Sequence, residues 1–187
     1  WNTLPALPAP PGVAGPYVGI SEDVLIVAGG ANFPEPVWES EKVWHDTIYV
    51  LLKDGAGGYR WAENVYHLER PLAYGASATS SYGVVCIGGN DATTHYADVF
   101  LLRWLPQEQK IARKKLPALP TPLAYSCAAI VGDMVYVAGG STTAELSTAV
   151  QACWRLDLKR IDDGELIEWE PLPAWPGPER AFAVAAS

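Results

Sequence analysis

Short apolar runs that each end on a pair of glycines organise the hydrophobic and polar positions along this chain. The runs read LIVAGG at residues 25–30, VVCIGG at 84–89 and VYVAGG at 135–140. The first glycines of the pairs, Gly29, Gly88 and Gly139, are separated by 59 and then 51 residues. Apolar runs of this length, bounded by turn-forming residues, are typical of buried strands. The pattern therefore predicts an all-β fold with a repeat of about 50 residues.

Each repeat is expected to contain four strands. The polar pairs Glu22-Asp23 and Gly132-Asp133 suit two-residue hairpin turns between a first and a second strand. No stretch shows convincing helical periodicity. The predicted strands are 17–21, 24–28, 48–52 and 59–65, then 74–80, 83–87, 98–103 and 110–116, then 125–131, 134–138, 152–157 and 166–170. Four-stranded units of this length indicate the blades of a kelch-type β-propeller.

Aromatic residues recur in step with these strands. Two sets are expected to match between repeats: Tyr17, Tyr74, Tyr125 and Phe182 at the start of first strands, and Tyr49, Phe100 and Trp154 in third strands. In a propeller such side chains mainly pack one blade against the next. The motif LPALP, at residues 4–8 and 116–120, is expected to connect a fourth strand to the following blade, where proline removes no ladder hydrogen bond.

The predicted strands divide the chain into three complete blades with flanking pieces. Residues 1–13 are expected to be the outer strand of a preceding blade and a linker, followed by blades at 14–69, 70–120 and 121–173. Residues 174–187 are expected to supply the first strand of the next blade. Propellers close into rings of about four to eight blades, because an open wedge exposes strand edges. We therefore expect this chain to be part of a longer polypeptide, or to join another chain that supplies the remaining blades.

Composition narrows the possible partners. The net charge of −8 makes a nucleic-acid backbone an unexpected ligand. No apolar run approaches the roughly 20 residues that a membrane-spanning helix needs, so no membrane partner is predicted. Cys86, Cys127 and Cys153 lie within apolar runs and lack metal-type spacing, which predicts buried free thiols. The sequence predicts no metal site and no cofactor.

A ligand is expected at the mouth of the central channel, where the connections after second strands and between blades meet. These segments are 31–44, 90–96 and 141–151. Arg70 and Arg180 precede first strands, where a guanidinium would clamp a carboxylate or form a salt bridge between blades. Polar and aromatic residues close behind the glycine pairs are candidates to bind a sugar, or else to form turns and pack beneath the loops. They are Asn32, Phe33, Asn90, Asp91 and Ser141.

Three residues are weak candidates for proton transfer. His45 and His95 lie near the ends of the first two loops, where a neutral imidazole would serve as a proton shuttle. Glu35 lies in an acidic loop and would act as a base if it were desolvated. Structural or solvated roles are the alternative for all three. No nucleophile elbow, P-loop or HExxH motif is present, so the residues alone do not assign the catalytic group.

Two segments carry a resemblance to a known family. GGANFPEPVW at 29–38 and KVWHDTIYVLL at 42–52 resemble the kelch-repeat sialic acid mutarotases, the N-acetylneuraminate epimerase group, and most closely their cyclically permuted branch. The resemblance implies a six-bladed ring, of which this chain would be about half. It also implies interconversion of the anomers of a sugar acid by ring opening and closure, without a metal or an organic cofactor. Relatives of this kind are often periplasmic in bacteria.

The resemblance also implies where acid–base chemistry would lie. The family is associated with a glutamate and an arginine in a loop of the type GExxPGxR. Here Gly164-Glu165 is followed by Leu-Ile, and Pro176-Gly177 by Pro-Glu-Arg. The principal acid–base residue is therefore either outside this chain or absent, while Arg70 or Arg180 would hold the carboxylate. The alternative function is a non-catalytic kelch propeller that binds a protein or a glycan, because this fold hosts many functions.

Overall fold

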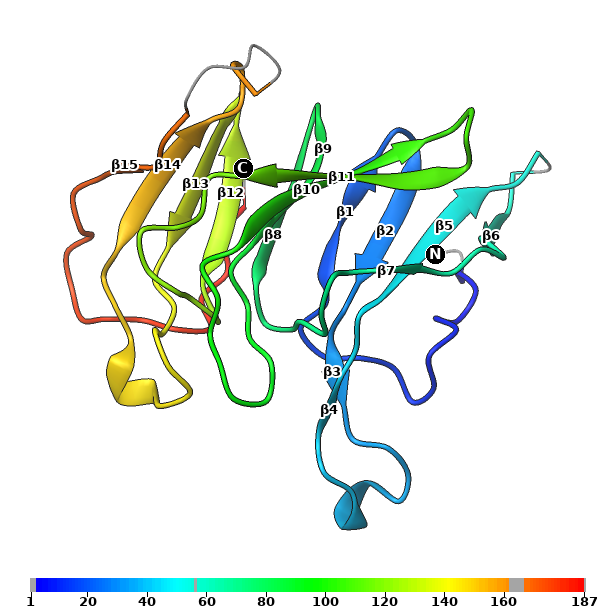
Figure 1. Ribbon diagram of the computed structural model, residues 1–187, viewed down its shortest axis with the longest axis horizontal. Coiled ribbons are helices and arrows are strands. Elements are labelled where there is room, and N and C mark those ends of the chain that lie inside the picture. The colour runs from blue at the N-terminus through cyan, green and yellow to red at the C-terminus, as the bar shows by residue number, and fades with distance from the viewer. Residues whose placement is uncertain (1–2, 56, 162–166, 187) are drawn as a thin grey trace.

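The computed structural model describes residues 3–55, 57–161 and 167–186, in which three antiparallel sheets stand side by side (Figure 1). Two short 3-10 turns, η1 (Val37–Glu39) and η2 (Leu146–Thr148), are the only helical elements in these ranges. No helix of the described chain is long and apolar enough to cross a bilayer. The all-β prediction is confirmed.

Each sheet is built from strands that follow one another along the chain, and we call the three sheets blades one, two and three. Blade one contains β1 (Tyr17–Ser21), β2 (Val24–Ala28), β5 (Thr47–Lys53), β6 (Tyr59–Trp61) and β7 (Tyr66–His67). Blade two contains β8 (Ala76–Ser80), β9 (Gly83–Ile87), β10 (Val99–Leu105) and β11 (Lys110–Leu116). Blade three contains β12 (Cys127–Val131), β13 (Met134–Ala138), β14 (Cys153–Asp157) and β15 (Glu170–Pro171). A separate hairpin pairs β3 (Ala31–Asn32) with β4 (Val43–Trp44).

The hydrophobic core lies between the blades. Every residue of β9 is buried, because both faces of blade two are covered. Successive side chains of a strand point to opposite faces, so Val84 packs in a cluster with blade one while Val85 packs with blade three. Tyr17 of blade one is fully buried and meets Phe100 of blade two edge to face at 5.6 Å. Burying such a side chain contributes about 1.5–3 kcal/mol, so each blade depends on its neighbour.

The pairing of the strands confirms one aromatic register and corrects the other. Tyr49, Phe100 and Trp154 occupy equivalent positions of the third strands, as predicted, because they pair with Val27, Cys86 and Val137. In the first strands, Tyr17 pairs with Ala28 and is equivalent to Ala76 and Cys127. Tyr74 and Tyr125 lie two residues before those positions, outside the strands. The single set of strand-opening aromatics was therefore wrong, because it merged two positions with different roles.

The outer strands differ most from the prediction. The expected strand 59–65 ends at Trp61, and the chain returns to pair with β5 through β7. In blade three the outer strand is β15, and residue Leu166 of the expected strand lies outside the described residues. The described part of 174–187 forms no strand, because no partner strand for it is among the described residues. An assignment of this segment to a further blade stays a prediction.

Each LPALP segment accepts a hydrogen bond from a tryptophan at the outer edge of a blade. The indole N–H of Trp61 donates to Ala6 O at 2.7 Å, and that of Trp169 donates to Pro117 O at 2.9 Å. In each case the outer edge of a blade holds the proline segment that precedes its first strand. Residues 3–13 form no named strand, and Trp1 lies outside the described residues.

Candidate functional site

The inner ends of the blades are joined by a chain of backbone hydrogen bonds, which we call the hub. Tyr74 N donates to Gly15 O at 2.7 Å, Tyr125 N to Tyr74 O at 2.7 Å, and Phe182 N to Tyr125 O at 2.8 Å. All four residues have φ between 58° and 62°, in the left-handed region. This backbone conformation is costly for residues other than glycine and persists only where the surroundings enforce it. The hub is therefore a strained and repeated feature, as functional sites often are.

The glycine pairs connect each blade to the hub. At Gly88 an added Cβ would lie 2.2 Å from Leu123 O, so no side chain fits. The next residue, Gly89, donates its N–H to the same carbonyl at 2.7 Å. The bonds from Gly30 N to Leu72 O and from Gly140 N to Arg180 O repeat this joint. Each pair thus brings the loop that follows it against the start of the next blade.

Three aromatic rings are stacked along the hub. The ring centroids of Tyr74 and Tyr125 are 5.1 Å apart, and those of Tyr125 and Phe182 are 4.4 Å apart. Tyr74 and Tyr125 are half-buried, whereas Phe182 is exposed. Tyr74 and Tyr125 each lie two residues before the first strand of their blade. We call these three rings the aromatic floor of the hub, and loop residues contact two of them: Lys42 lies over Tyr74, and His95 meets Tyr125 edge to face.

A buried polar network lies beside this floor. Asn90 and His95 are only 3% and 8% exposed. Asn90 Nδ2 donates to Tyr125 Oη at 3.0 Å and lies 3.3 Å from His95 Nε2, while Asn90 Oδ1 accepts from Trp44 Nε1 at 3.1 Å. His95 Nδ1 lies 3.1 Å from Ser141 O. One residue of the first loop, two of the second and one of the third are therefore linked at the hub.

The protonation state of His95 follows from these partners. Burial lowers the pKa of His95, and the hydrogen bond to Ser141 O only partly opposes this effect. A carbonyl oxygen can only accept, so Nδ1 carries the proton of the neutral ring and Nε2 accepts from the Asn90 amide. The ring thereby fixes which way Asn90 faces. Because Tyr125 Oη accepts from Asn90, its own hydrogen is directed away from that amide.

Lys42 reaches the same site from the first loop, one residue before β4. Its Nζ lies 4.2 Å from the ring centroid of Tyr74 and 5.0 Å from that of Trp44. Both distances are within the range of a cation–π contact. The site thus combines an aromatic floor, a phenol, a buried amide and one ammonium group.

His45 and Asn32 form a separate contact at the base of the first loop. His45 Nε2 lies 2.9 Å from Asn32 Oδ1, and Asn32 Nδ2 donates to Gly12 O at 2.8 Å. Because Asn32 Oδ1 only accepts, His45 carries a proton on Nε2. These bonds hold the β3–β4 hairpin to the segment that precedes blade one.

Asp91 and Arg70 belong to a cluster on the rim. Tyr96 Oη donates to Asp91 Oδ2 at 2.5 Å, and Asp91 Oδ1 accepts from the Thr93 and Thr94 amides. Burial acts to raise the pKa of Asp91, but these hydrogen bonds together hold it below its usual value. Arg70 stacks on Tyr96 at 4.6 Å and pairs with Asp98 at 3.5 Å. The cluster orders the second loop.

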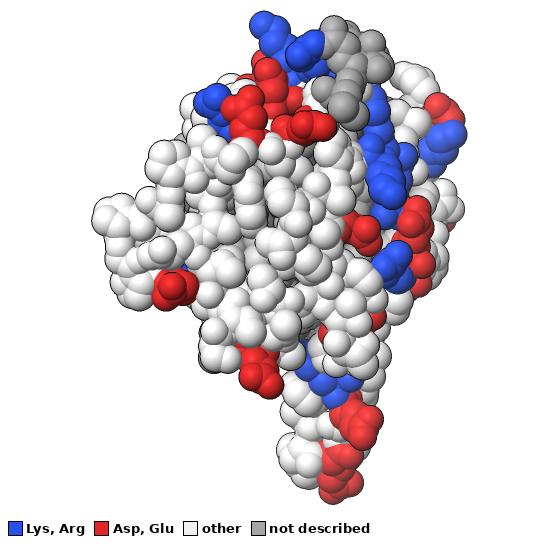
Figure 2. Space-filling view, turned by 60° about the vertical axis from the view of Figure 1, so that its left-hand side comes forward, with Lys and Arg blue, Asp and Glu red and all other residues white. Residues whose placement is uncertain are grey.

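Four other candidate residues lie apart from this network or turn their side chains from it. Ser141 is fully buried, and its Oγ donates to Thr143 O at 2.9 Å. Phe33 and Glu35 are exposed on the long hairpin that projects from the body with its acidic side chains (Figure 2). Arg180 is exposed near Trp175, with its guanidinium 6.0 Å from that ring. The structure therefore gathers His95 and Asn90, and leaves Phe33, Glu35 and Arg180 apart.

Sequence reasoning missed Lys42, Trp44 and the side chains of the hub as site residues. One signal was available: the triplets Leu-Ala-Tyr at 72–74 and 123–125 and Arg-Ala-Phe at 180–182 recur where the backbone turns left-handed. Trp44 and Lys42 carry no such signal. Their contacts join different blades.

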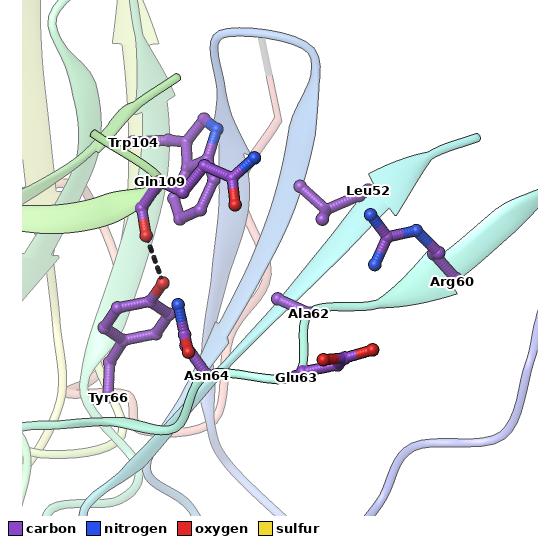
Figure 3. A pocket seen from close by; sticks show the side chains of 8 residues that line it. All are labelled: Leu52, Arg60, Ala62, Glu63, Asn64, Tyr66, Trp104 and Gln109. Carbon is purple, nitrogen blue, oxygen red and sulfur yellow. Dashed lines mark hydrogen bonds between the residues drawn. The ribbon is translucent and has the colours of Figure 1, made fainter. Parts of the chain in front are cut away.

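A concavity lies between the outer parts of blades one and two. A cavity of about 220 Å³ opens between β6 and β7 of blade one and the β10–β11 turn of blade two, and Tyr66 Oη donates there to Gln109 O at 2.5 Å (Figure 3). Its lining comprises Leu52, Arg60, Ala62, Glu63, Asn64, Tyr66, Trp104 and Gln109. None of the site residues predicted from the sequence lines it. In the described residues no group of three or more His, Cys, Asp or Glu side chains is placed to hold a metal ion.

Fold and hub together define the class of the molecule: these are neighbouring blades of a kelch-type β-propeller. The solved structure of YjhT matches 96% of this chain and 56% of its own, with a TM-score of 0.73 and 13% identity. No protein-family profile matches the sequence.

Among curated proteins, the particular similarity is to N-acetylneuraminate epimerases, and it confirms the resemblance predicted from the sequence. The Vibrio cholerae protein is 36% identical over 122 residues, which cover 56% of this chain and 30% of the relative. The Yersinia enterocolitica protein is 34% identical over 90 residues, covering 42% and 21%. The Haemophilus influenzae protein is 32% identical over 105 residues, covering 48% and 26%. The matches thus span less than a third of these relatives.

Proposed function

We propose that the protein interconverts the anomers of N-acetylneuraminate, and that the sugar binds at the hub, beside the rings of Tyr74 and Tyr125. The observation that carries this proposal is the similarity to several proteins named N-acetylneuraminate epimerase. The hub supports it, because an aromatic floor with adjacent polar groups suits a pyranose ring that presents one apolar face and several hydroxyls.

The reaction needs two proton transfers. A base removes the proton of the anomeric hydroxyl, and an acid protonates the ring oxygen as the ring opens. Within this chain the Tyr125 hydroxyl is placed to donate a hydrogen bond to a sugar oxygen, because Asn90 occupies its acceptor side. His95, neutral and bonded through both ring nitrogens, acts by fixing Asn90. Glu35, His45 and His95 remain the predicted candidates for proton transfer.

The other predicted contacts keep their place in this proposal. Asn90, a predicted sugar-binding residue, acts in this proposal by orienting Tyr125, because its buried amide already bonds Tyr125, His95 and Trp44. Arg70 and Arg180 remain the predicted carboxylate contacts. Arg70 already pairs with Asp98, however, and Arg180 lies beside Trp175, after the last strand of blade three.

Exchange NMR of N-acetylneuraminate with the full-length protein tests the activity. We expect exchange between the two anomers to be faster with the protein than in buffer alone. Tyr125→Phe should slow it, because the phenylalanine ring keeps the floor and removes the donor. Val131→Ala, which changes an exposed side chain of β12, is the matched control. A wild-type rate equal to that of buffer would reject the enzymatic proposal.

A second candidate is a propeller that binds a protein or a glycan without turnover. The projecting hairpin favours it, because Trp38 at its tip is 84% exposed and lies beside the exposed Val37. Large exposed aromatic residues are frequent binding hot spots. Tight binding on a glycan array or to a protein partner, lost in Trp38→Ala and without anomer exchange, would support this function.

A further inference from the structure

We infer that Lys42 binds the carboxylate of the sugar acid, and that the rings of Trp44 and Tyr74 hold the Lys42 ammonium group in place at the hub. The inference rests on the proposed function and deepens it. Neither the residue pattern of the chain nor the family resemblance pointed to this lysine.

The first step concerns the charge of Lys42. Across residues 3–55, 57–161 and 167–186, no carboxylate oxygen forms an ion pair with Lys42 Nζ. Two arginines are already paired: Arg70 contacts Asp98, and Arg113 contacts Glu69 at 2.5 Å. Lys42 is half-buried and touches two aromatic faces instead. Lys42 is therefore a cation at the site without a carboxylate partner in the described residues, and a bound ligand would supply that anion.

The second step concerns how firmly the ammonium is placed. Trp44 donates its indole N–H to Asn90 Oδ1, and the buried Asn90 is held in turn by His95. Tyr74 is fixed by the hub, where its N–H donates to Gly15 O. Two ring faces of fixed orientation thus limit where Lys42 points. A cation placed in advance binds its partner with less loss of conformational entropy.

The third step concerns the chemistry of the ligand. Lys42 Nζ lies over the Tyr74 ring, and Tyr125 stacks beside that ring at 5.1 Å. A carboxylate on the ammonium would place the attached sugar ring over the aromatic floor, within reach of the Tyr125 hydroxyl. A neutral sugar would leave the ammonium unpaired. The arrangement therefore selects sugar acids over neutral sugars.

The test compares a sugar acid with its neutral ester on the full-length protein. N-acetylneuraminate and its methyl ester are titrated into wild type, Lys42→Gln, Lys42→Arg and Lys53→Gln, and anomer exchange is followed with the acid. Lys53 pairs with Asp23 at the far end of blade one and controls for loss of charge. We expect Lys42→Gln to weaken binding of the acid by about 10- to 100-fold and to change ester binding by less than about 2-fold. Lys42→Arg should restore most of the loss, and Lys53→Gln should change nothing.

The outcomes separate this inference from the proposed function. If wild type neither binds the acid nor accelerates exchange, the proposed function fails first. If wild type is active and Lys42→Gln binds the acid as wild type does, the inference about Lys42 alone fails. Equal affinity of wild type for acid and ester also overturns it, and this comparison requires no folded variant. A melting temperature for each variant verifies that losses are not due to unfolding.

Discussion

The loops that follow the second strands of blades one and two occupy the same place in the repeat but behave differently. In blade two, residues 90–96 form a short loop, and its ends, Asn90 and His95, are buried at the hub. In blade one, residues 31–44 form a long hairpin whose tip carries Trp38 into solvent (Figure 1). The returning part of the hairpin carries Lys42 and Trp44 to the hub. The comparison teaches that the short loop fixes the geometry of the site, while the long loop contributes charge.

The largest loss of folding stability is expected from a substitution at the glycine pair where a loop leaves its blade. Gly88→Ala should lower the free energy of unfolding by more than about 3 kcal/mol, because the new Cβ meets the Leu123 carbonyl in a left-handed residue. Gly57→Ala is the matched control: its φ is also positive, but nothing lies within 4 Å of the added atom. It should cost about 1 kcal/mol. Denaturant unfolding measures both, and equal losses would show that the joint does not constrain the blades.

A smaller effect is expected within the short loop. Asn90→Ala removes the partner of Trp44, His95 and Tyr125 together, and should cost about 2 kcal/mol because buried polar groups lose their hydrogen bonds. Trp38→Ala, in the long loop, should change the free energy of unfolding by less than about 0.5 kcal/mol. Thermal unfolding compares the two. A Trp38 variant as unstable as the Asn90 variant would remove the distinction between the loops.

The smallest effect is a pH dependence that belongs to the short loop. The pKa of folded His95 is below its unfolded value of about 6.5, so the unfolded chain binds the proton more readily. His95 makes its full contribution to the free energy of unfolding above about pH 6.5. This contribution is lost as the pH falls through the pKa of His95 in the folded protein. His95→Gln should reduce the fall in the free energy of unfolding between pH 7 and pH 5. The same fall in the wild type and in this variant would contradict the assignment.

By itself, the sequence determined the repeat, the central strands of each blade and the register of Tyr49, Phe100 and Trp154. These features rest on local causes, namely alternation of apolar residues and turns that glycine permits. It also indicated Asn90 and His95, because they flank a short polar loop.

The tertiary structure alone decided what those residues do. The bond between Trp44 and Asn90 spans 46 positions, as does that between His95 and Ser141. Three further features arise where blades meet. They are the offset of Tyr74 and Tyr125 from the strands, the neutral state of His95, and the placement of Lys42 over Tyr74. A local pattern encodes how a strand pairs within its own sheet. It does not encode which side chain of a neighbouring blade will face it, because that depends on how whole sheets pack.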